Sequence, residues 1–514
     1  MFQSENPFQN RYRITGQLTT LSPLHIGAGD PSYLRDRLQA MRTVERDTRR
    51  RDWIDSQLSG ENPEVAAFYG HGNELRIPGS SLKGVLSAGD TRSQIFGTVD
   101  GEGKAESGGK VTFYDAVCTP RATVTNADGY WLAPRGTYVL PNVGIDAKLR
   151  SAQENLLYYT EVAPPGTVFQ VTLIAENLEP SELLSLRQRL TDAFHPHGAT
   201  LGAGTANGWG VVQWQETNVE VIELGDMKEW LKNPAKRFDT LFRLHTVDKL
   251  TLRVEPTRDL LKIQITLPFT GRMIVNDPTQ MRAKGAGDTD GRYVVGKTPI
   301  RLADGRVYLP ASSVRGALRA QARRLWQTVK WEQANLNKVP RRDLNPRQER
   351  DVVTSLPPFN QVFGAGGWKS PLFVPDFHLV NGEESITQHF VAIDRFHGGA
   401  AANRKFQTRA LDRPKFEGTI TVNLAALETA RVGDWFYLFL LFLLRDLREG
   451  DIYFGAQSAK GYGQVKAQIQ LEGGPHAELL QGVLNRDPAS LQHSTLIDWN
   501  RDWEKITNAN RKEN

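Results

Sequence analysis

The sequence has little of several features that mark well-known classes of protein. Its 514 residues include one cysteine, Cys118, so neither a disulfide nor a cysteine-based zinc site can form within one chain, and a reducing, cytoplasmic location is expected. The N-terminus lacks the basic and then apolar pattern of a signal peptide. The longest apolar run, residues 435–444, falls well short of the roughly 20 residues that a membrane span needs, so it predicts a buried helix and no membrane partner.

The excess of positive over negative charge is also small. The net charge of +5 is compatible with a nucleic-acid partner, but over this length it creates no strong field. The ten histidines show no metal-ligand spacing such as His-Glu-X-X-His, so they are expected to be structural or to lie near a ligand. With 39% hydrophobic and 24% charged residues, the chain is expected to fold into two or more globular domains.

A short phrase occurs twice and is the strongest local signal. Residues 76–86 read Arg-Ile-Pro-Gly-Ser-Ser-Leu-Lys-Gly-Val-Leu, and residues 308–318 read Tyr-Leu-Pro-Ala-Ser-Ser-Val-Arg-Gly-Ala-Leu. Proline prevents a helix before it and serine favours the N-cap, so each phrase predicts a helix that the serines cap. The free N–H groups of the first turn, with Lys83 or Arg315, would suit a phosphate; a capped surface helix is the alternative.

Five further features recur in the same order in the two halves of the chain. They are the alternating strands at 11–22 and 261–267, the Phe-Gly dipeptides at 96–97 and 363–364, the strands that end in Asp115 and Asp376, the Ile-Asp dipeptides at 145–146 and 393–394, and the glycine-rich loops at 201–212 and 454–465. Repetition in one order predicts a tandem duplication.

The order of elements in each half predicts the fold. Strand, loop, helix, two strands, helix, glycine-rich loop and strand favour an α+β fold, here two tandem modified ferredoxin-like (RRM-like) domains with insertions. The expected boundaries are residues 1–224 for the first domain, 225–260 for a connector, 261–472 for the second domain and 473–514 for a polar tail. Trp499 and Trp503 in that tail suggest a docking helix.

One insertion interrupts the first domain at about residues 31–56. Leu34, Leu38, Met41 and Val44 recur at helical spacing, and arginines mixed with acids cover the other face. A solvated, salt-bridged helix and a contact to an RNA backbone both fit this pattern.

Taken together, these phrases resemble one known family. The combination of Leu24-His-Ile-Gly, Ile-Pro-Gly-Ser-Ser-Leu-Lys-Gly, Phe-Gly, Ile-Asp-Arg and the late Gly-X-Gly-X-X-X-Gly-X-Gly loop looks like the RAMP superfamily of CRISPR-associated proteins. Within it, the chain is most similar to the backbone subunits of type III effector complexes, and above all to the fused double-backbone subunit of the type III-D variants. The resemblance implies guide RNA, target RNA, and other RAMP-type and large subunits of the effector complex as partners.

The resemblance also implies residues that contact RNA without reading its sequence. In the family, a thumb-like hairpin around Ile393-Asp394-Arg395 wedges into the guide–target duplex, and the first half keeps the Ile-Asp pair but has Ala147 in place of arginine. Glycines in the two late loops would let a backbone approach phosphate closely, or serve packing alone through positive φ. The expected RNA-binding residues are His25, Ser80, Ser81, Lys83, Lys148, Arg150, Asn207, Trp209, Ser312, Ser313, Arg315, Arg395, Arg404 and Lys460.

Type III backbone subunits typically cut target RNA through an aspartate between the first strand and the Ser-Ser phrase. The expected chemistry is attack of the ribose 2′-hydroxyl on the adjacent phosphate, assisted by a divalent cation such as Mg²⁺. Asp288 and Asp290 lie on a glycine-flanked tip in the second half, with Asp277 upstream. In the first half the candidates are Asp30 and Asp36, while Glu61 stands where family members commonly have Asp.

Three functions remain open on the sequence. The first is a guide-bound endoribonuclease subunit, and the second is a non-catalytic RNA-binding scaffold whose neighbours cut. The third is a guide-RNA processing endoribonuclease, although such relatives usually lack the Ser-Ser-Leu-Lys-Gly phrase and rely on a histidine general acid.

Overall fold

A computed structural model describes most of the chain, and it divides into two compact units. Unit 1 comprises Met1–Thr125, Tyr130–Thr205 and Trp209–Val254, and unit 2 comprises Asn126–Gly129, Ala206–Gly208 and Glu255–Asn514. The described residues are 7–27, 39, 42, 51, 55, 65–87, 95–99, 105–120, 131–132, 135–145, 152–196, 198–232, 237–250, 259–277, 295–302, 305–330, 353, 356–365, 368–384 and 387–508.

Unit 1 is built on a sheet whose first strand lies at the centre. β1 (Asn10–Thr20) pairs antiparallel with β12 (Val168–Glu176) on one side and with β13 (Val212–Glu223) on the other. The strand order is β14-β13-β1-β12-β8-β4-β3, in which β14 is Arg243–Leu244, β8 is Ala116–Cys118, β4 is Glu74–Ile77 and β3 is Gly70–His71. Alternate residues of β1 are buried, as the sequence pattern predicts for a sheet with one covered face.

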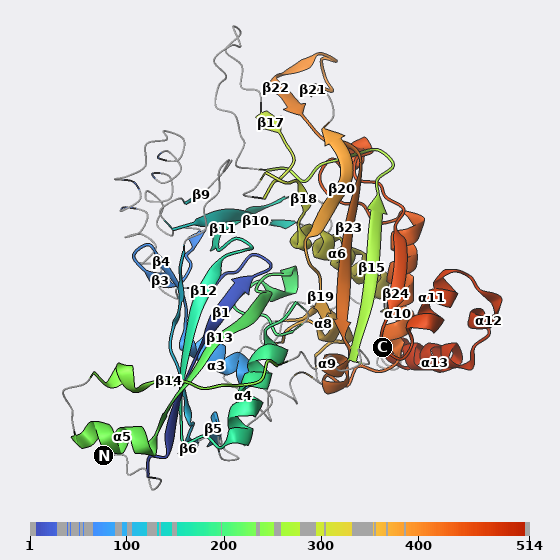
Figure 1. The fold of residues 1–514 in the computed structure, drawn as a ribbon. Coiled ribbons are helices and arrows are strands. Elements are labelled where there is room, and N and C mark those ends of the chain that lie inside the picture. Colours follow the sequence, from blue (N-terminus) through green and yellow to red (C-terminus); the bar gives the residue numbers. More distant parts are fainter. Residues whose placement is uncertain are drawn as a thin grey trace. The chain divides into compact units, whose positions relative to one another are not determined.

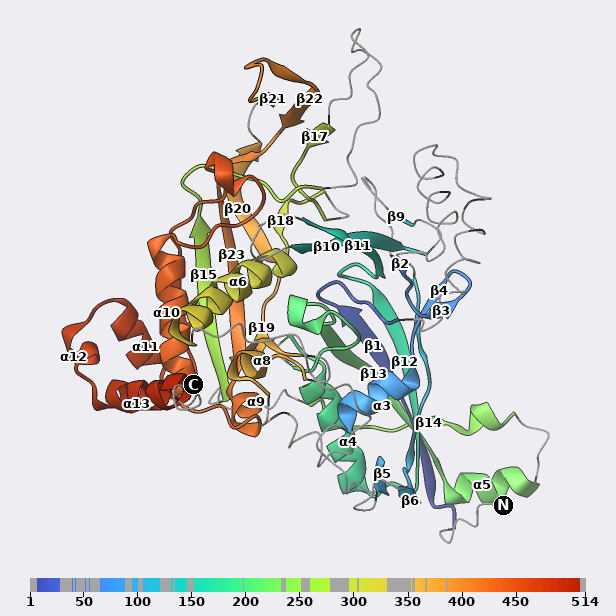
Figure 2. The ribbon, with the colours of Figure 1, turned by 180° about the vertical axis from the view of Figure 1, so that it is seen from behind.

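Two helices cover that face of unit 1 (Figure 2). α3 (Gly79–Leu86) follows β4 (Glu74–Ile77), and α4 (Pro180–Ala193) joins β12 to β13. Leu82 of α3 and Leu186 of α4 belong to the same buried cluster as Ile14 of β1, so sheet and helices share one core.

Unit 2 repeats this arrangement. β15 (Leu260–Pro268) lies between β23 (Leu411–Asn423) and β24 (Gln468–Glu472). The strand order is β18-β20-β23-β15-β24, in which β18 is Tyr308–Leu309 and β20 is Phe377–Glu384. α6 (Ala311–Lys330) and α10 (Trp435–Glu449) pack on one face of the sheet. The apolar run at 435–444 is therefore a buried helix, as predicted, and no helix in the described part of the chain meets the length and hydropathy of a membrane span.

Each unit also carries a second, smaller sheet made around a hairpin (Figure 1). In unit 1, β10 (Thr137–Ile145) pairs with β11 (Ala152–Val162), to which β2 (Val65–Ala66) adds a parallel strand. In unit 2, β21 (Gln388–Ile393) pairs with β22 (Ala400–Thr408), to which β17 (Val295–Lys297) adds a parallel strand. The mixed α and β content with antiparallel sheets agrees with the sequence prediction.

The segments flanking the two domains are more ordered than the sequence indicates. Residues 225–260, expected to be a connector, contribute α5 (Leu224–Lys232) and β14 (Arg243–Leu244), and β14 extends the sheet of unit 1. Partners elsewhere in unit 1 explain this order, since Arg13 Cζ of β1 lies 4.1 Å from the Phe242 ring centroid. Of the insertion at 31–56, only four single residues are described, and among them Arg42 bonds Asp55.

The C-terminal tail forms a helical cap on α10 in unit 2. α11 (Ala477–Leu484), α12 (Pro488–Leu491) and α13 (Ser494–Asn508) follow the last strand. Trp503 stacks on Phe439 of α10 at 5.9 Å between ring centroids and meets Trp326 of α6 edge-on at 5.7 Å. The docking helix that the two tryptophans predicted is confirmed.

Candidate RNA-binding sites

The first helix of unit 1 begins differently from the sequence prediction. Pro78 is the N-cap residue of α3, and neither Ser80 nor Ser81 caps the helix, since no side chain at the cap position accepts a hydrogen bond. Instead the Gly79 N–H donates to Asp115 Oδ1 at 3.0 Å, from the segment that follows β7 (Val111–Phe113). The expected serine cap is therefore wrong, and Ser80 is left exposed in the first turn.

The first helix of unit 2 uses the same contact. The Ala311 N–H donates to Asp376 Oδ1 at 2.7 Å, so a carboxylate again occupies the helix start and Ser312 is again exposed. Burial raises the pKa of Asp376 to about 6, and the hydrogen bond from Ala311 opposes part of that rise. Because both helices receive the carboxylate from a remote segment, the first serine of each pair, Ser80 or Ser312, lies exposed beside the helix start.

The two cations that follow the serines have different environments. Lys83 is half-buried on α3, whereas Arg315 of α6 is buried, with Nη1 donating to the Leu372 carbonyl at 3.2 Å and Nη2 to the Phe363 carbonyl at 2.6 Å. Burial, with a smaller effect from Arg319, lowers the pKa of Arg315 to about 10. Arg315 therefore joins its helix to the last residue of α8 (Pro358–Phe363) and to β19 (Leu372–Phe373), and Lys83 is the more accessible of the two cations.

Glycine allows each late loop to run against the strand exit of its own unit. Gly202 has a φ of +75° and Gly455 a φ of +81°, and a Cβ on either would collide with the carbonyl of His25 or Ile274. The following residues bond those same carbonyls, Ala203 N at 2.9 Å and Ala456 N at 2.8 Å. The alternative that glycine serves packing is thus realised at these two positions.

Other loop positions remain open. In the first loop Trp209 is buried and Asn207 is half-buried. In the second, Gly461 has a φ of +80° with open space where a Cβ would stand, and it follows Lys460. Lys460 Nζ lies 4.2 Å from the Phe390 ring centroid, and partial burial together with Lys297 lowers the pKa of Lys460.

The second glycine-rich loop is bonded to the base of the β21–β22 hairpin. Gln457 Nε2 donates to Thr408 Oγ1 at 2.9 Å, and the Tyr462 hydroxyl donates to Gln388. Tyr462 also packs with Phe390 in a small apolar cluster. Loop and hairpin therefore form one surface in unit 2, with Lys460 on it.

The tip of that hairpin is shaped by the aspartate of the Ile-Asp-Arg motif. Asp394 Oδ1 accepts from Phe396 N at 2.8 Å and from His397 N at 2.9 Å, and these bonds lower the pKa of Asp394. The turn leaves Arg395 exposed and Phe396 97% exposed. Sequence reasoning missed Phe396, although an aromatic residue two positions after a turn-forming aspartate was the available signal.

His25 lies in the core of unit 1. The residue is 5% exposed, and its Nδ1 lies 2.7 Å from the Glu161 carbonyl oxygen. Because a carbonyl oxygen can only accept a hydrogen bond, Nδ1 carries the proton. Burial lowers the pKa of His25 more than that hydrogen bond raises it, which favours the neutral ring. Beside it, the buried Arg135–Glu161 pair at 2.5 Å fixes β11, so His25 is positioned as a structural residue of the strand exit.

Several predicted site residues lie outside the described part of the chain. Of the acids named as catalytic candidates, only Asp277 lies in the described part of the chain. Asp277 is buried, and its backbone N–H donates to the Thr298 carbonyl at 2.9 Å. Within the described ranges, no three His, Cys, Asp or Glu side chains gather as a metal site. The residues whose side chains lie outside the description are Asp30, Asp36, Glu61, Lys148, Arg150, Asp288, Asp290 and Arg404.

Comparison with known proteins assigns the family. The model of the RAMP superfamily matches residues 17–213 and 289–466, one segment in each unit and together more than half of the chain. The chain therefore belongs to the RAMP superfamily.

Two further comparisons add little to this assignment. No curated protein matches the sequence. A chain of the solved structure titled "Type III-B Cmr-beta Cryo-EM structure of the Apo state" is similar at 14% identity and a TM-score of 0.26, over 40% of this chain and 97% of that one. So low a score carries no argument about function.

Proposed function

We propose that this protein is a guide-RNA-binding backbone subunit of a type III CRISPR effector complex, of the fused double-backbone kind found in type III-D variants. Membership of the RAMP superfamily in two segments supports the proposal. The central place of the first strand in each unit, β1 between β12 and β13 and β15 between β23 and β24, also supports it, because a modified ferredoxin-like domain would place its first strand there.

One observation carries the proposal most directly. In unit 2 the glycine-rich loop is bonded to a hairpin, so a cation at Lys460 and an exposed tip with Arg395 and Phe396 belong to one surface. Cations suit a phosphate backbone, and an exposed aromatic ring suits an unstacked base. Sequence choice would then come from base pairing between guide and target, while the protein supplies shape and charge.

The proposal includes cleavage of the target RNA. The 2′-hydroxyl attacks the neighbouring phosphorus, the bond to the 5′-oxygen of the next nucleotide breaks, and a cyclic 2′,3′-phosphate remains. An aspartate of the acidic loops would orient or deprotonate the hydroxyl. Asp288 and Asp290 are oxygen donors of the type that Mg²⁺ prefers, and the ion would offset charge on the phosphate.

Mapping every cut in target RNA tests the enzymatic part. The assembled, guide-loaded complex with Mg²⁺ is compared with two double variants, Asp288→Ala plus Asp290→Ala and Asp30→Ala plus Asp36→Ala. Loss of one cut with target binding retained would identify that half as a nuclease. Survival of all cuts in both variants would contradict cleavage at these loops and leave a scaffold, unless Glu61 or Asp277 variants abolish a cut.

A processing role is separated by a different assay. The purified chain alone is incubated with precursor guide RNA. Cutting at a repeat without other subunits would contradict the backbone proposal.

A further inference from the structure

α6 carries an unusual set of charges for a helix of 20 residues. From Ala311 to Lys330 it has five cations and no aspartate or glutamate. Three of the cations, Arg315, Arg319 and Arg323, are spaced four residues apart and follow one stripe of the helix, hereafter the arginine row. Successive members are separated by about 6 Å along the axis, and like charges at this spacing destabilise a helix.

No carboxylate neutralises the arginine row within the described structure. Arg315 is satisfied by two backbone carbonyls. Arg319 Nε is buried and makes no hydrogen bond, and the Arg319 guanidinium lies 5.7 Å from the Phe359 ring centroid. Burial and the charge of Arg323 both lower the pKa of Arg319.

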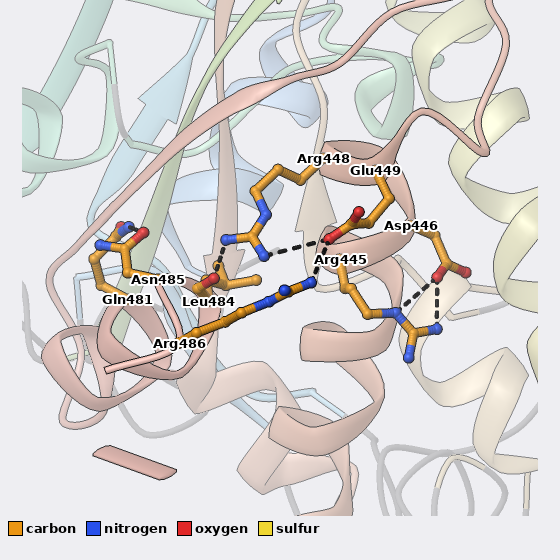
Figure 3. Close-up of polar contacts among 8 residues, drawn as sticks. All are labelled: Arg445, Asp446, Arg448, Glu449, Gln481, Leu484, Asn485 and Arg486. Carbon is orange, nitrogen blue, oxygen red and sulfur yellow. Dashed lines mark hydrogen bonds and ion pairs between the residues drawn. The ribbon is translucent and has the colours of Figure 1, made fainter. Parts of the chain in front are cut away.

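The arginines of the neighbouring helix α10 show the usual arrangement (Figure 3). Arg445 pairs with Asp446 at 2.7 Å, and Glu449 pairs with Arg448 at 3.6 Å and with Arg486 of the helical cap at 3.2 Å. Those cations are compensated inside the protein. Among the described residues no acid compensates the arginine row, so an anion from outside the protein would be its natural partner.

The rest of the α6 surface favours RNA over a protein as the source of that anion. Exposed positions of α6 beside the row are small or polar, such as Ser312, Gly316 and Ala320. Of the large apolar side chains that are exposed in the described chain, none lies on α6. A protein interface needs apolar or aromatic anchors at its centre, whereas a phosphate backbone needs cations and close approach.

We propose that Arg319 and Arg323 bind neighbouring phosphates of an RNA backbone, as an extension of the surface that starts at Ser312. The Phe359 ring lies beside the Arg319 guanidinium, and Arg315 ties the helix to α8 and β19. Guanidinium groups suit this role because they bind phosphate through two parallel hydrogen bonds. The inference rests on the proposed RNA-binding function.

The row distinguishes the two halves of the chain. Aligned on the Ser-Ser phrase, the positions of Arg319 and Arg323 correspond to Ser87 and Thr91 in the first half. Unit 2 therefore has a contact to the backbone that unit 1 lacks.

The test measures how RNA affinity depends on salt. Binding of the full-length chain to a labelled, unstructured single-stranded RNA is titrated at several salt concentrations for the wild type and for Arg319→Gln plus Arg323→Gln. Each lost phosphate contact lowers the slope of log affinity against log salt by about 0.7, so the double variant is expected to lose about 1.4. The matched control, Arg486→Gln plus Arg501→Gln, removes the same charge from cations that are paired with acids.

The outcomes separate this inference from the function on which it rests. A smaller slope in the double variant only, with an unchanged melting temperature, supports the row as a phosphate contact. An equal change in the control, or no change, overturns it while RNA binding by the wild type stands. No RNA binding by the wild type, alone or with partner subunits, overturns the proposed function as well. Because Arg319 packs on Phe359, the single variant Arg323→Gln provides a second reading, with an expected loss of about 0.7.

Discussion

At the scale of single residues, the two halves begin their first helix with the same aspartate contact, but the cations that follow, Lys83 and Arg315, differ in burial. Asp115 and Asp376 each accept from the first N–H of the helix. The sequence assigned this role to serines, because serine is a common N-cap and the aspartates lie 36 and 65 residues away. A contact of that length has no local pattern, so it becomes visible only in the folded chain.

The raised pKa of Asp376 predicts a pH dependence of stability. Its folded pKa of about 6 exceeds the unfolded value of about 3.9, so the folded state holds the proton more tightly. The free energy of unfolding should therefore fall as pH rises from about 4 to 6 and stay level above. Denaturant unfolding of wild type and Asp376→Asn across this range should show the fall in the wild type only; parallel curves would contradict the prediction.

The different burial of the two cations predicts that the same substitution affects stability strongly at Arg315 and hardly at Lys83. Arg315→Met leaves two buried carbonyls without donors and should lower the free energy of unfolding by about 2 kcal/mol, whereas Lys83→Met should change it by less than about 0.5 kcal/mol. Thermal unfolding measures the first effect, and RNA binding should weaken with Lys83→Met. Equal stability of the two variants would mean that Arg315 does not join α6 to α8 and β19.

At the scale of elements, periodicity predicted most of the fold. The alternating residues of β1 and β15, the apolar run of α10, the leucines of α4 and the two tryptophans of α13 all had local patterns that the structure confirms. The segment 225–250 escaped prediction because its partners, such as Arg13 beneath Phe242, are on β1. Lys83 and Arg315 fit one motif and yet differ in burial, because α6 lies against α8 while α3 packs by α4.

At the tip of the β21–β22 hairpin, we expect one residue to affect RNA affinity without affecting the stability of the fold. Phe396 is 97% exposed, so Phe396→Ala should change the unfolding free energy by less than about 0.5 kcal/mol. If its ring stacks on a base, the loss of about 1–3 kcal/mol should weaken binding of the guide–target duplex by at least about five-fold. Ile497→Ala, also exposed, is the control, and equal affinities for the two variants would remove the hairpin tip from the RNA surface.

At the scale of the whole molecule, one chain contains two copies of the same construction. Each unit has a central first strand, a helix started by a remote aspartate, a hairpin with a parallel third strand and a glycine-rich loop against the strand exit. A subunit with two RNA-binding domains should cover a stretch of guide about twice as long as a single-domain relative. Nuclease protection measures it, and a footprint of one domain's length would contradict that expectation.

The central claim is that both units hold RNA, and mapping cross-links tests it most directly. The guide-loaded complex is irradiated, and RNA-linked peptides of this chain are identified by mass spectrometry. The account predicts links within residues 79–86 and 200–212 of the first half, and within 394–399, 455–463 and 312–323 of the second. Links confined to one half would contradict the double-backbone proposal, and the absence of links from all five segments would contradict RNA binding by these surfaces.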